Sequence, residues 1–506
     1  MSGDAVTSAT RRTFLAAAAP AILRSQARRR PNILFAIADD QSYPHTGAMG
    51  DRVVKTPNID RLAENGVLFR NAFCPAPQCA PTRASILTGR YIWQNEEAGT
   101  HASLFPKKLQ VYPELLAAAG YFTGLTGKGA GPCNWKASGW PHNPAGPSFD
   151  ERRDRGVPQG VSNNDYSANF ADFLTARPTD KPFCFWYGCQ EPHRVYKKGI
   201  GVESGKKLAD VVVPPFLPDT AEVRSDMLDY YTEIEHFDRH LGRIVDQIRK
   251  AGELNNTLIV ITSDNGMAFP GSKATMYDYG WHLPLVIAWP ERVPAGRAVD
   301  DLVSFIDFAP TYLEAAGLKP GPAITGRSLL PVLESKQSGR VDAARDKIFG
   351  GRERHSHARF DNLGYPARSI RTHRFLYTRN FKPDRWPAGD PEGYHDIDGS
   401  PTKNLMMERR KEPSMEPLFA HCFGKHPEEE LFDIVNDPGC LKNLAAAPEH
   451  ARTRKQLRAD LDRTLTVQKD PRMSASEIFD AYPRHSGMRP ELGGFATQGA
   501  YNPKFR

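Results

Sequence analysis

The chain has 506 residues, of which 40% are hydrophobic and 25% charged, and its formal net charge is +7. This length exceeds what one small core accommodates and predicts a large α/β domain with a smaller one beside it. The basic residues are spread along the sequence rather than gathered in one block. The charge therefore mildly favours acidic partners, and we expect no nucleic acid among them.

The first 27 residues have the pattern of an export signal. Arg11 and Arg12 match a twin-arginine motif, and an apolar stretch over 13–23 follows that is too short to span a membrane. Ser25-Gln26-Ala27, with small residues at both ends, is the predicted cleavage site. We predict that residues 1–27 are a twin-arginine signal peptide and that the protein is periplasmic or secreted; a basic tail with an apolar patch is the alternative. No later stretch predicts a transmembrane helix.

An apolar run over residues 31–38 predicts a buried parallel strand, and Asp39 and Asp40 follow it directly. Ligands bind at this edge of open α/β sheets. Adjacent carboxylates repel each other unless a cation neutralises them, and ligation by oxygen alone favours Ca²⁺ or Mg²⁺. The pair predicts a metal site; a solvated Asp-Asp turn is the alternative.

Residues 78–90 predict a helix with a cysteine at its start. Pro81 suits a first helical turn, and Gly89 suits the helix end. Cys79 then lies where free N–H groups attract anions, and Arg83 adds a positive charge one turn along. The stretch predicts a nucleophile beside an anion site; a buried cysteine at a loop-to-helix junction is the alternative.

The next elements follow from hydrophobic periodicity and from capping or turn residues. We predict helices over 56–66, 111–119, 230–248 and 307–316, and strands over 121–126, 182–188, 257–262 and 283–289.

Polar residues follow three of these strands. Lys128 lies in a glycine-rich loop whose spacing is not that of a P-loop. His193 follows a proline after the 182–188 strand and is an acid/base candidate, with a structural loop histidine as the alternative. Asp264 and Asn265 end the 257–262 strand. With the first aspartate pair they provide three carboxylates and an amide oxygen, a set that suits a hard cation.

A polar segment over 334–345 is the predicted domain boundary, which gives an N-terminal domain at 31–340 and a C-terminal subdomain at 346–506. We predict short strands at 348–350 and within 368–380, the latter at the edge of an antiparallel sheet. A basic helix over 448–468 carries leucines on one face. The final residues, 492–506, have little periodicity, and we expect them to wrap the surface.

The seven cysteines leave at least one unpaired in an exported protein, which fits a special role for Cys79. No spacing indicates structural zinc. Cys184 with Cys189, and Cys422 with Cys440, are candidates for local disulfides, and the sequence leaves the pairing open.

The motif Cys-x-Pro-x-Arg at Cys79, followed by Leu-Thr-Gly, resembles the type I sulfatases, in which this cysteine is oxidised to formylglycine. Thr82 stands where the family most often has serine. The likeness runs over 31–471 and is closest to bacterial proteins similar to heparan N-sulfatases (sulfamidases). It implies an alkaline phosphatase-like fold: a large mixed, mostly parallel sheet flanked by helices, with a smaller C-terminal α+β subdomain.

The resemblance also implies site roles and partners. A sulfated saccharide is the expected substrate, and a formylglycine-generating enzyme is needed for maturation. Ca²⁺, or Mg²⁺ by the oxygen chemistry above, is the expected cofactor. The implied metal ligands are Asp39, Asp40, Asp264, Asn265 and the modified Cys79. The implied catalytic residues are Cys79 itself, the cations Arg83, Lys128 and Lys273, and either His193 or Lys273 as the proton donor to the leaving group.

One departure stands out. The family commonly has a histidine two residues after the lysine, where this chain has Ala130. We expect His101 or His282 to approach Cys79 instead. Further expected substrate contacts are Glu191, Arg194, His282, Arg352, Glu353, Arg354 and His355. The last four form a polar cluster in the sequence. The alternative interpretation of these four residues is a solvated charged loop.

Two other functions stay open. One is a phosphoesterase of the alkaline phosphatase superfamily, although such enzymes usually combine Thr or Ser with two metals. The other is an exported glycan-binding homologue without turnover, which the alanine at position 130 favours. The sequence leaves open the sugar, the choice between N- and O-sulfo groups, and the oligomeric state.

Overall fold

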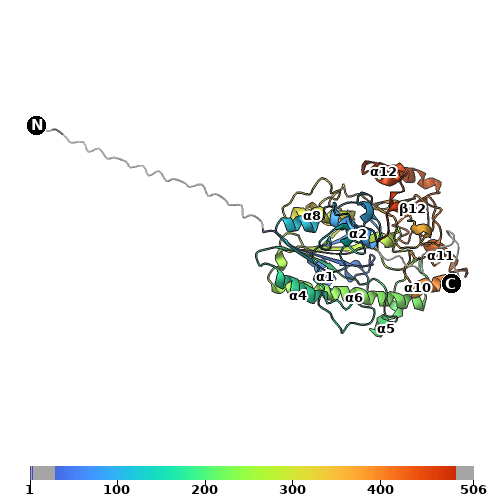
Figure 1. Ribbon diagram of the computed structural model, residues 1–506, viewed down its shortest axis with the longest axis horizontal. Helices are drawn as coiled ribbons and strands as arrows, with labels where there is room; N and C mark the ends of the chain where they lie inside the picture. Colours follow the sequence, from blue (N-terminus) through green and yellow to red (C-terminus); the bar gives the residue numbers. More distant parts are fainter. Residues whose placement is uncertain (2, 4–28, 392, 486–506) are drawn as a thin grey trace.

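The computed structural model describes residues 29–391 and 393–485, together with Met1 and Gly3. Apart from Met1 and Gly3, the predicted export signal lies outside the described residues, and so does the 492–506 tail. Within the described part, none of the helices is both long and apolar enough to cross a bilayer. Two sheets organise this part of the chain (Figure 1).

The larger sheet has eight strands in the order β3-β4-β1-β5-β6-β2-β7, and β8 also pairs with β2. β3, β4, β1 and β5 run parallel, whereas β6 is antiparallel to both of its neighbours. The predicted mixed, mostly parallel sheet is therefore confirmed. The strands are β1 Asn32–Ala38, β2 Val67–Phe73, β3 Phe122–Gly127, β4 Phe183–Gly188, β5 Thr257–Ser263, β6 His282–Ala288, β7 Arg297–Val299 and β8 Val303–Ser304.

The central strands are apolar on both faces because helices cover both faces. Alternate residues of β1 enter different cores: Phe35 packs on the side of α2, α3 and α8, and Leu34 on the side of α1, α4 and α6. The helices of this part are α1 Pro57–Glu64, α2 Cys79–Thr88, α3 Tyr112–Ala118, α4 Tyr166–Ala176, α5 Ile200–Glu203, α6 Ala221–Lys250, α7 Asp278–Trp281, α8 Phe308–Ala315 and α9 Leu330–Glu334.

The smaller sheet is antiparallel, in the order β12-β11-β10-β9. Its strands are β9 Lys347–Arg352, β10 Ala367–Thr372, β11 Phe375–Asn380 and β12 Glu429–Asp433, and the accompanying helices are α10 Pro401–Glu408, α11 Glu416–Phe423, α12 Ala451–Val467 and α13 Ile478–Ala481. The prediction that 368–380 forms the sheet edge is wrong. β9 pairs with β10 and β12 pairs with β11, so the β10–β11 hairpin lies in the middle of the sheet. The predicted basic helix is present as α12, and its leucines are buried.

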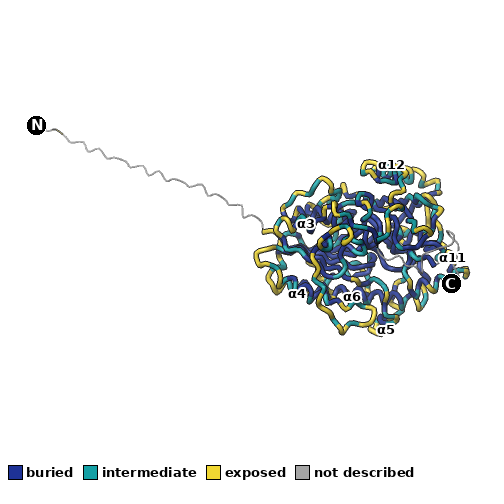
Figure 2. Tube along the Cα trace, in the orientation of Figure 1, coloured by how far each residue is buried: buried dark blue, intermediate teal, exposed yellow. Residues whose placement is uncertain are grey.

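The two sheets share one core. Ile348, Leu376 and Phe432 of the smaller sheet belong to the same buried cluster as Phe35 of the larger one. In Figure 2 buried residues fill the middle of the molecule, and exposed residues lie mostly around its rim. The proposed boundary lies in the connection between α9 and β9, and its exact position stays a prediction.

All seven cysteines are buried and free, so both proposed disulfides are wrong. Cys184 lies on β4, and Cys189 follows it at an odd spacing, so their side chains enter opposite cores of the sheet. Cys422 and Cys440 also belong to separate clusters. An odd cysteine count therefore carries no argument about Cys79.

Candidate active site

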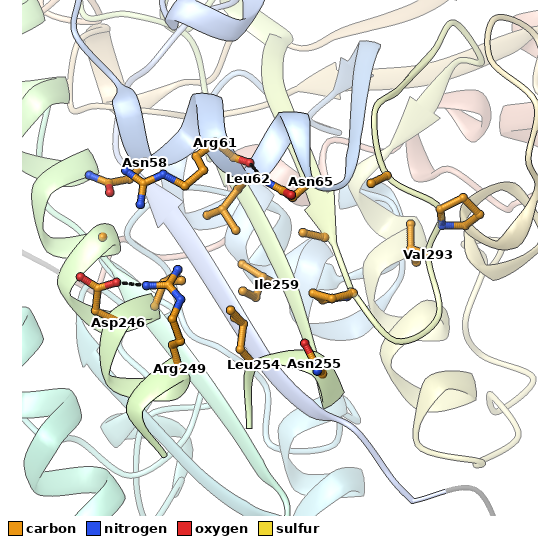
Figure 3. Close-up of a pocket in the computed structure, with 16 residues that line it drawn as sticks. Asn58, Arg61, Leu62, Asn65, Asp246, Arg249, Leu254, Asn255, Ile259 and Val293 are labelled. Carbon is orange, nitrogen blue, oxygen red and sulfur yellow. Dashed lines mark hydrogen bonds and ion pairs between the residues drawn. The ribbon is translucent and has the colours of Figure 1, made fainter. Parts of the chain in front are cut away.

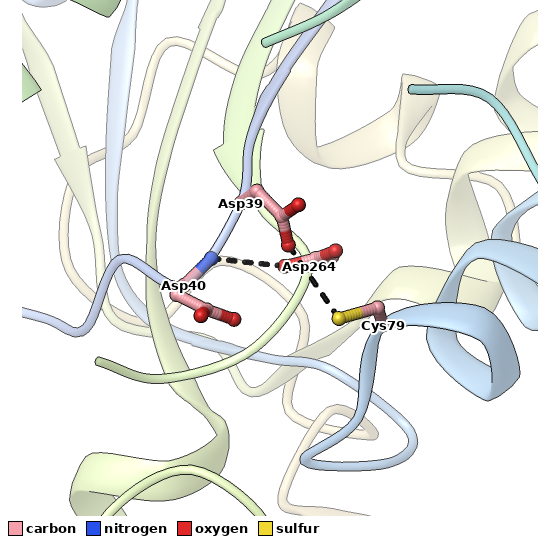
Figure 4. A group of neighbouring side chains, drawn as sticks. All are labelled: Asp39, Asp40, Cys79 and Asp264. Atoms are coloured by element: carbon pink, nitrogen blue, oxygen red, sulfur yellow. Dashed lines mark hydrogen bonds between the residues drawn. The ribbon is translucent and has the colours of Figure 1, made fainter. Parts of the chain in front are cut away.

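Four polar residues meet where β1 and β5 end. The two strands are parallel neighbours in register, with Ala38 beside Ser263, so the residues that follow them lie side by side. Asp39, Asp40, Asp264 and Asn265 are all buried there. The Asp40 backbone N–H donates to Asp264 Oδ1 at 3.2 Å, which ties the two strand ends together (Figure 4).

Helix α2 brings Cys79 to this group. The chain leaves β2 at Phe73, and the helix begins at Cys79, whose Sγ lies 3.5 Å from Asp39 Oδ1. One ligand atom from each of Asp39, Asp40, Cys79 and Asp264 lies within 4.8 Å of the others. We call these four residues and Asn265 the carboxylate cluster.

Each carboxylate of the cluster has one cationic partner. Arg83 Nε lies 2.7 Å from Asp264 Oδ2, Lys128 Nζ lies 2.5 Å from Asp39 Oδ2, and Lys273 Nζ lies 2.7 Å from Asp40 Oδ2. The three cations come from α2, from the loop after β3 and from the loop after β5. The structure therefore brings together every residue of the predicted metal site and all three predicted cations.

The environment sets the ionisation of these groups. Burial raises the pKa of Asp39, but Lys128, His193 and Arg83 outweigh this effect and hold that pKa well below its usual range. Burial and the neighbouring Asp39 raise the pKa of Asp264 to about 6. Burial also raises the pKa of the Cys79 thiol well above its ordinary value, so the sulfur stays protonated and is a weak nucleophile.

The cluster has the oxygen ligands that a hard cation requires. Asn265 Nδ2 donates to Asp40 Oδ1 at 2.7 Å, while Asn265 Oδ1 is buried without a hydrogen-bond partner among the described residues. A buried amide oxygen in that state is unusual and needs an explanation. Three carboxylates with one free amide oxygen form the oxygen-rich set that Ca²⁺ or Mg²⁺ prefers.

His193 lies at the open side of the cluster. Its Nε2 is 3.9 Å from Asp40 Oδ2, and its side chain is 37% exposed. It lines a cavity of about 280 Å³ together with Asp39, Lys128 and Glu191. A partly exposed imidazole beside the cations is well placed to exchange a proton with a bound molecule.

Glu191 and Arg194 also border this cavity, but both are held by the protein. Glu191 accepts hydrogen bonds from the Ser162 backbone N–H and the Tyr166 hydroxyl. Arg194 makes two 2.8 Å contacts with the Asp226 carboxylate. Their evident role is to shape the loop that carries His193.

His282 does not approach the cluster with a free nitrogen, so that expectation is wrong. Its ring stacks on Tyr43 and Phe73, Nδ1 lies 2.9 Å from Asp278 Oδ2, and Nε2 lies 2.8 Å from the Arg70 carbonyl. It packs as the first residue of β6.

For His101 the expectation stays a prediction. Its ring packs edge-to-face on His355 at 4.5 Å, and its Nδ1 is buried without a partner among the described residues. Burial, His355 and the charges of Lys128 and Lys273 all lower its pKa, so the ring is neutral and lies within the field of both active-site lysines.

The 352–355 segment is neither a solvated loop nor, as a whole, a substrate-contacting cluster. All four side chains are buried. Glu353 pairs with Arg368 and Arg472 at 2.8 and 2.7 Å, and Arg352 and His355 both approach Asp396. Arg354 donates to Ser103 Oγ at 2.7 Å. These residues hold the C-terminal part of the chain together behind the site.

Sequence reasoning missed Asp398. This residue lies between β11 and α10, and its Oδ2 is 3.1 Å from Lys273 Nζ. No strand end or motif marks it, because its closeness to Lys273 depends on how the two sheets pack.

A second cavity, of about 480 Å³, lies between α1, α6 and the start of β5 (Figure 3). Its lining includes Arg61, Arg249 and Ile259 and none of the cluster residues. Because Ile259 is near the beginning of β5 and Asp264 follows its end, this cavity is separate from the chemistry described above.

The fold matches solved structures of other proteins. A solved structure of a protein with its substrate D-glucosamine-2-N,6-O-disulfate has a TM-score of 0.65 at 23% identity, covering 87% of this chain and 99% of that one. The phosphonate monoester hydrolase of Agrobacterium radiobacter has a TM-score of 0.60 at 21% identity, covering 87% and 96%. At these identities the likeness shows the alkaline phosphatase-like fold.

Sequence relatives narrow the family. Human N-sulphoglucosamine sulphohydrolase is 30% identical over 492 residues, covering 89% of this chain and 93% of the relative. An ulvan-active sulfatase of Formosa agariphila is 29% identical over 491 residues, covering 91% and 79%. The Sulfatase family model matches residues 31–318, and the model for the C-terminal part of N-sulphoglucosamine sulphohydrolase matches residues 271–390. With more than half of the chain matched, and with the cluster built inside the matched region, the chain belongs to the sulfatase family.

Proposed function

We propose that this sulfatase hydrolyses the sulfo groups, as esters or sulfamates, of a sulfated saccharide. The observation that carries the proposal is the cluster itself: a motif cysteine, three carboxylates and a free amide oxygen, faced by three cations. The substrate class is supported by relatives that act on N-sulphoglucosamine and ulvan, and by the fold shared with a protein bound to a disulfated glucosamine.

The cluster is proposed to hold Ca²⁺. Asp39, Asp40, Asp264, Asn265 and residue 79 would be its ligands. When bound, the cation supplies Lewis-acid polarisation of a sulfo oxygen and lowers the pKa of a neighbouring hydroxyl.

Residue 79 is proposed to act as formylglycine, formed by a formylglycine-generating enzyme. The buried, protonated thiol of Cys79 is a weak nucleophile, which is why an unmodified cysteine serves this chemistry poorly. Once formed, its hydrated aldehyde would supply one hydroxyl for attack on sulfur and a second for release of the sulfate.

The remaining steps belong to the chain's own side chains. Arg83, Lys128 and Lys273 place fixed positive charge around the sulfo oxygens, where charge grows in the transition state. His193 lines the cavity that gives access to the cluster and donates a proton to the departing atom, with Lys273 as the other candidate.

The phosphoesterase alternative is less well supported. The fold does not distinguish a sulfatase from a phosphoesterase, because a phosphonate monoester hydrolase shares it. However, among the described residues one group of acidic, histidine and cysteine side chains is compact enough to hold an ion, whereas the expected phosphoesterases use two metals.

Export through the twin-arginine route is proposed from Arg11 and Arg12, together with the apolar stretch that follows them. Changing both arginines to lysine in the full-length chain should retain the protein inside the producing cell, as fractionation would show. Unchanged export would rule out this route.

A sulfate-release assay tests the proposed activity. The full chain is produced with a formylglycine-generating enzyme, the mass of the peptide containing residue 79 is measured, and sulfate release is followed over defined sulfated saccharides. We expect formylglycine and turnover, and we expect Cys79→Ala to reduce turnover by about 10⁴-fold or more.

Cys74→Ala is the matched control, because Cys74 is a fully buried cysteine outside the cluster. It should retain turnover per folded molecule. Formylglycine without sulfate release from any saccharide would favour a binding protein, and equal activity in the Cys79→Ala variant would exclude the covalent mechanism.

A further inference from the structure

Lys273 is held between two carboxylates. Its Nζ lies 2.7 Å from Asp40 Oδ2 in the cluster and 3.1 Å from Asp398 Oδ2 on the other side. Lys273 is almost fully buried, whereas the Asp398 side chain is 31% exposed. Asp398 therefore forms an ion pair with an active-site lysine and still has surface that an incoming molecule can reach.

The segment that carries Asp398 is firmly anchored. Two residues earlier, Asp396 is buried and accepts hydrogen bonds from Arg352 and Arg359. Lys403 Nζ donates to the carbonyls of Tyr394 and Ile397, the latter at 2.8 Å. Because the residues on both sides of Asp398 are fixed, its carboxylate is preorganised beside Lys273.

Asp398 is negatively charged in this position. Burial raises its pKa, but Lys273, His193 and His355 outweigh that effect and hold it well below the usual range. A carboxylate near a site for sulfo groups is unfavourable on its own, because both groups are anions. Because it lies beside Lys273, one of the two candidate proton donors, we looked for a substrate group that it would stabilise.

The chemistry of the leaving group supplies such a partner. In sulfamate hydrolysis an S–O bond to a water oxygen forms and the S–N bond breaks. The nitrogen takes both water protons and leaves as an ammonium ion, together with a sulfate dianion. In ester hydrolysis the leaving oxygen takes one proton and leaves as a neutral alcohol, while the second proton goes to solvent. Only the sulfamate reaction creates a cation.

We propose that Asp398 is a specificity-determining residue that favours sulfamates over sulfate esters by pairing with the departing ammonium group. The inference rests on the proposed sulfatase function and adds a residue and a preference to it. A neutral alcohol gains no comparable attraction from the carboxylate. The same carboxylate holds Lys273, and the experiment must separate that positioning role from discrimination between substrates.

The test compares two monosaccharides, glucosamine N-sulfate and N-acetylglucosamine 6-O-sulfate, on the full-length, formylglycine-containing enzyme with Ca²⁺. The wild-type enzyme should prefer the sulfamate. Asp398→Asn keeps the shape and removes the charge. Its kcat/KM should fall by about 10- to 100-fold on the sulfamate, the range for one charge-assisted hydrogen bond, and by less than about 3-fold on the ester.

Asp398→Glu, which restores the charge on a longer arm, should recover part of the preference. Asp384→Asn is the matched control, since Asp384 is an exposed aspartate of the same subdomain; it should change neither rate. An equal fall in kcat/KM on both substrates would mean that Asp398 only positions Lys273. That result would overturn this inference and leave the proposed function standing.

A wild-type enzyme that prefers the ester would overturn the inference without any variant, even if Asp398→Asn failed to fold. A wild-type enzyme that contains formylglycine but releases sulfate from neither sugar, nor from any other sulfated saccharide, would overturn the proposed function and this inference together.

Discussion

At the residue scale, the active site has an alanine where its family commonly has a histidine. Ala130 is fully buried, and its backbone N–H donates to Asn143 Oδ1 at 3.1 Å, so the loop after Lys128 is held by its backbone. His101, from a different segment, packs on His355 with an unpartnered, buried Nδ1. The ring is neutral, and we predict that it takes part in the proton transfer that the absent histidine leaves open.

We expect His101→Ala to lower kcat by about 100-fold, the lower end of what one acid/base group contributes. KM should change much less, because the ring is not expected to bind the sugar. His450→Ala is the control, since that histidine lies at the start of α12 and packs on Phe375. Steady-state kinetics on the best saccharide measure both variants. An unchanged kcat in His101→Ala would leave another group responsible for proton transfer.

At the element scale, α2 does most to build the site, and its two ends have different tasks. Its first residue is Cys79, and at its last turn Gly89 adopts φ 67° while its N–H donates to the Ser85 carbonyl. A Cβ at Gly89 would lie 2.9 Å from the Ile324 side chain and 3.1 Å from Ala309. The glycine therefore allows both the left-handed turn and the close packing against α8.

Gly89→Ala should lower the free energy of unfolding by about 1–2 kcal/mol for the left-handed backbone, plus a further amount for the contact with Ile324. Gly317→Ala is a matched control, because Gly317 has φ 77° but nothing within 4 Å of its added Cβ. Urea unfolding of both variants isolates the packing contribution as the difference between them. Equal losses in the two variants would show that the packing at Gly89 relaxes freely.

At the scale of the whole molecule, the smaller sheet is part of the catalytic unit. It shares a core with the larger sheet, and the segments around it bring Asp398 and His355 towards the site. Behind them lies a buried ionic network in which Glu353 bridges Arg368 and Arg472, and Arg368 also pairs with Asp470 at 2.6 Å. This network ties β9 and β10 to the segment after α12.

Glu353→Gln should destabilise the fold by about 3–5 kcal/mol, because it leaves two buried guanidinium groups without their shared carboxylate. Glu428→Gln is the control: that side chain is 58% exposed and makes only a 3.5 Å contact with Arg458, so its change should stay within about 0.5 kcal/mol. Denaturant unfolding measures both. A loss at Glu353 as small as at Glu428 would show that water or neighbouring acids replace the missing charge.

Much of this protein followed from local sequence. The buried strands were predictable because their apolar runs are the right length and end in turn residues, and α2 was predictable from Pro81 and Gly89. The candidate metal ligands that follow β1 and β5 were predictable as a set, since parallel strands place their carboxyl ends at one edge of a sheet. Resemblance to the sulfatases then linked Cys79, Lys128 and Lys273, which no local rule connects.

Other features were decided only by tertiary structure. The closeness of Asp398 to Lys273, the placement of His101 on His355 and the covering of the β10–β11 hairpin by β12 all join segments that are far apart in the chain. His282 has an imidazole, the side chain that the site was expected to use, but its two ring nitrogens contact Asp278 and the Arg70 carbonyl instead. The physical reason is that hydrophobic periodicity and capping act over a few residues, whereas these contacts depend on how two sheets share one core.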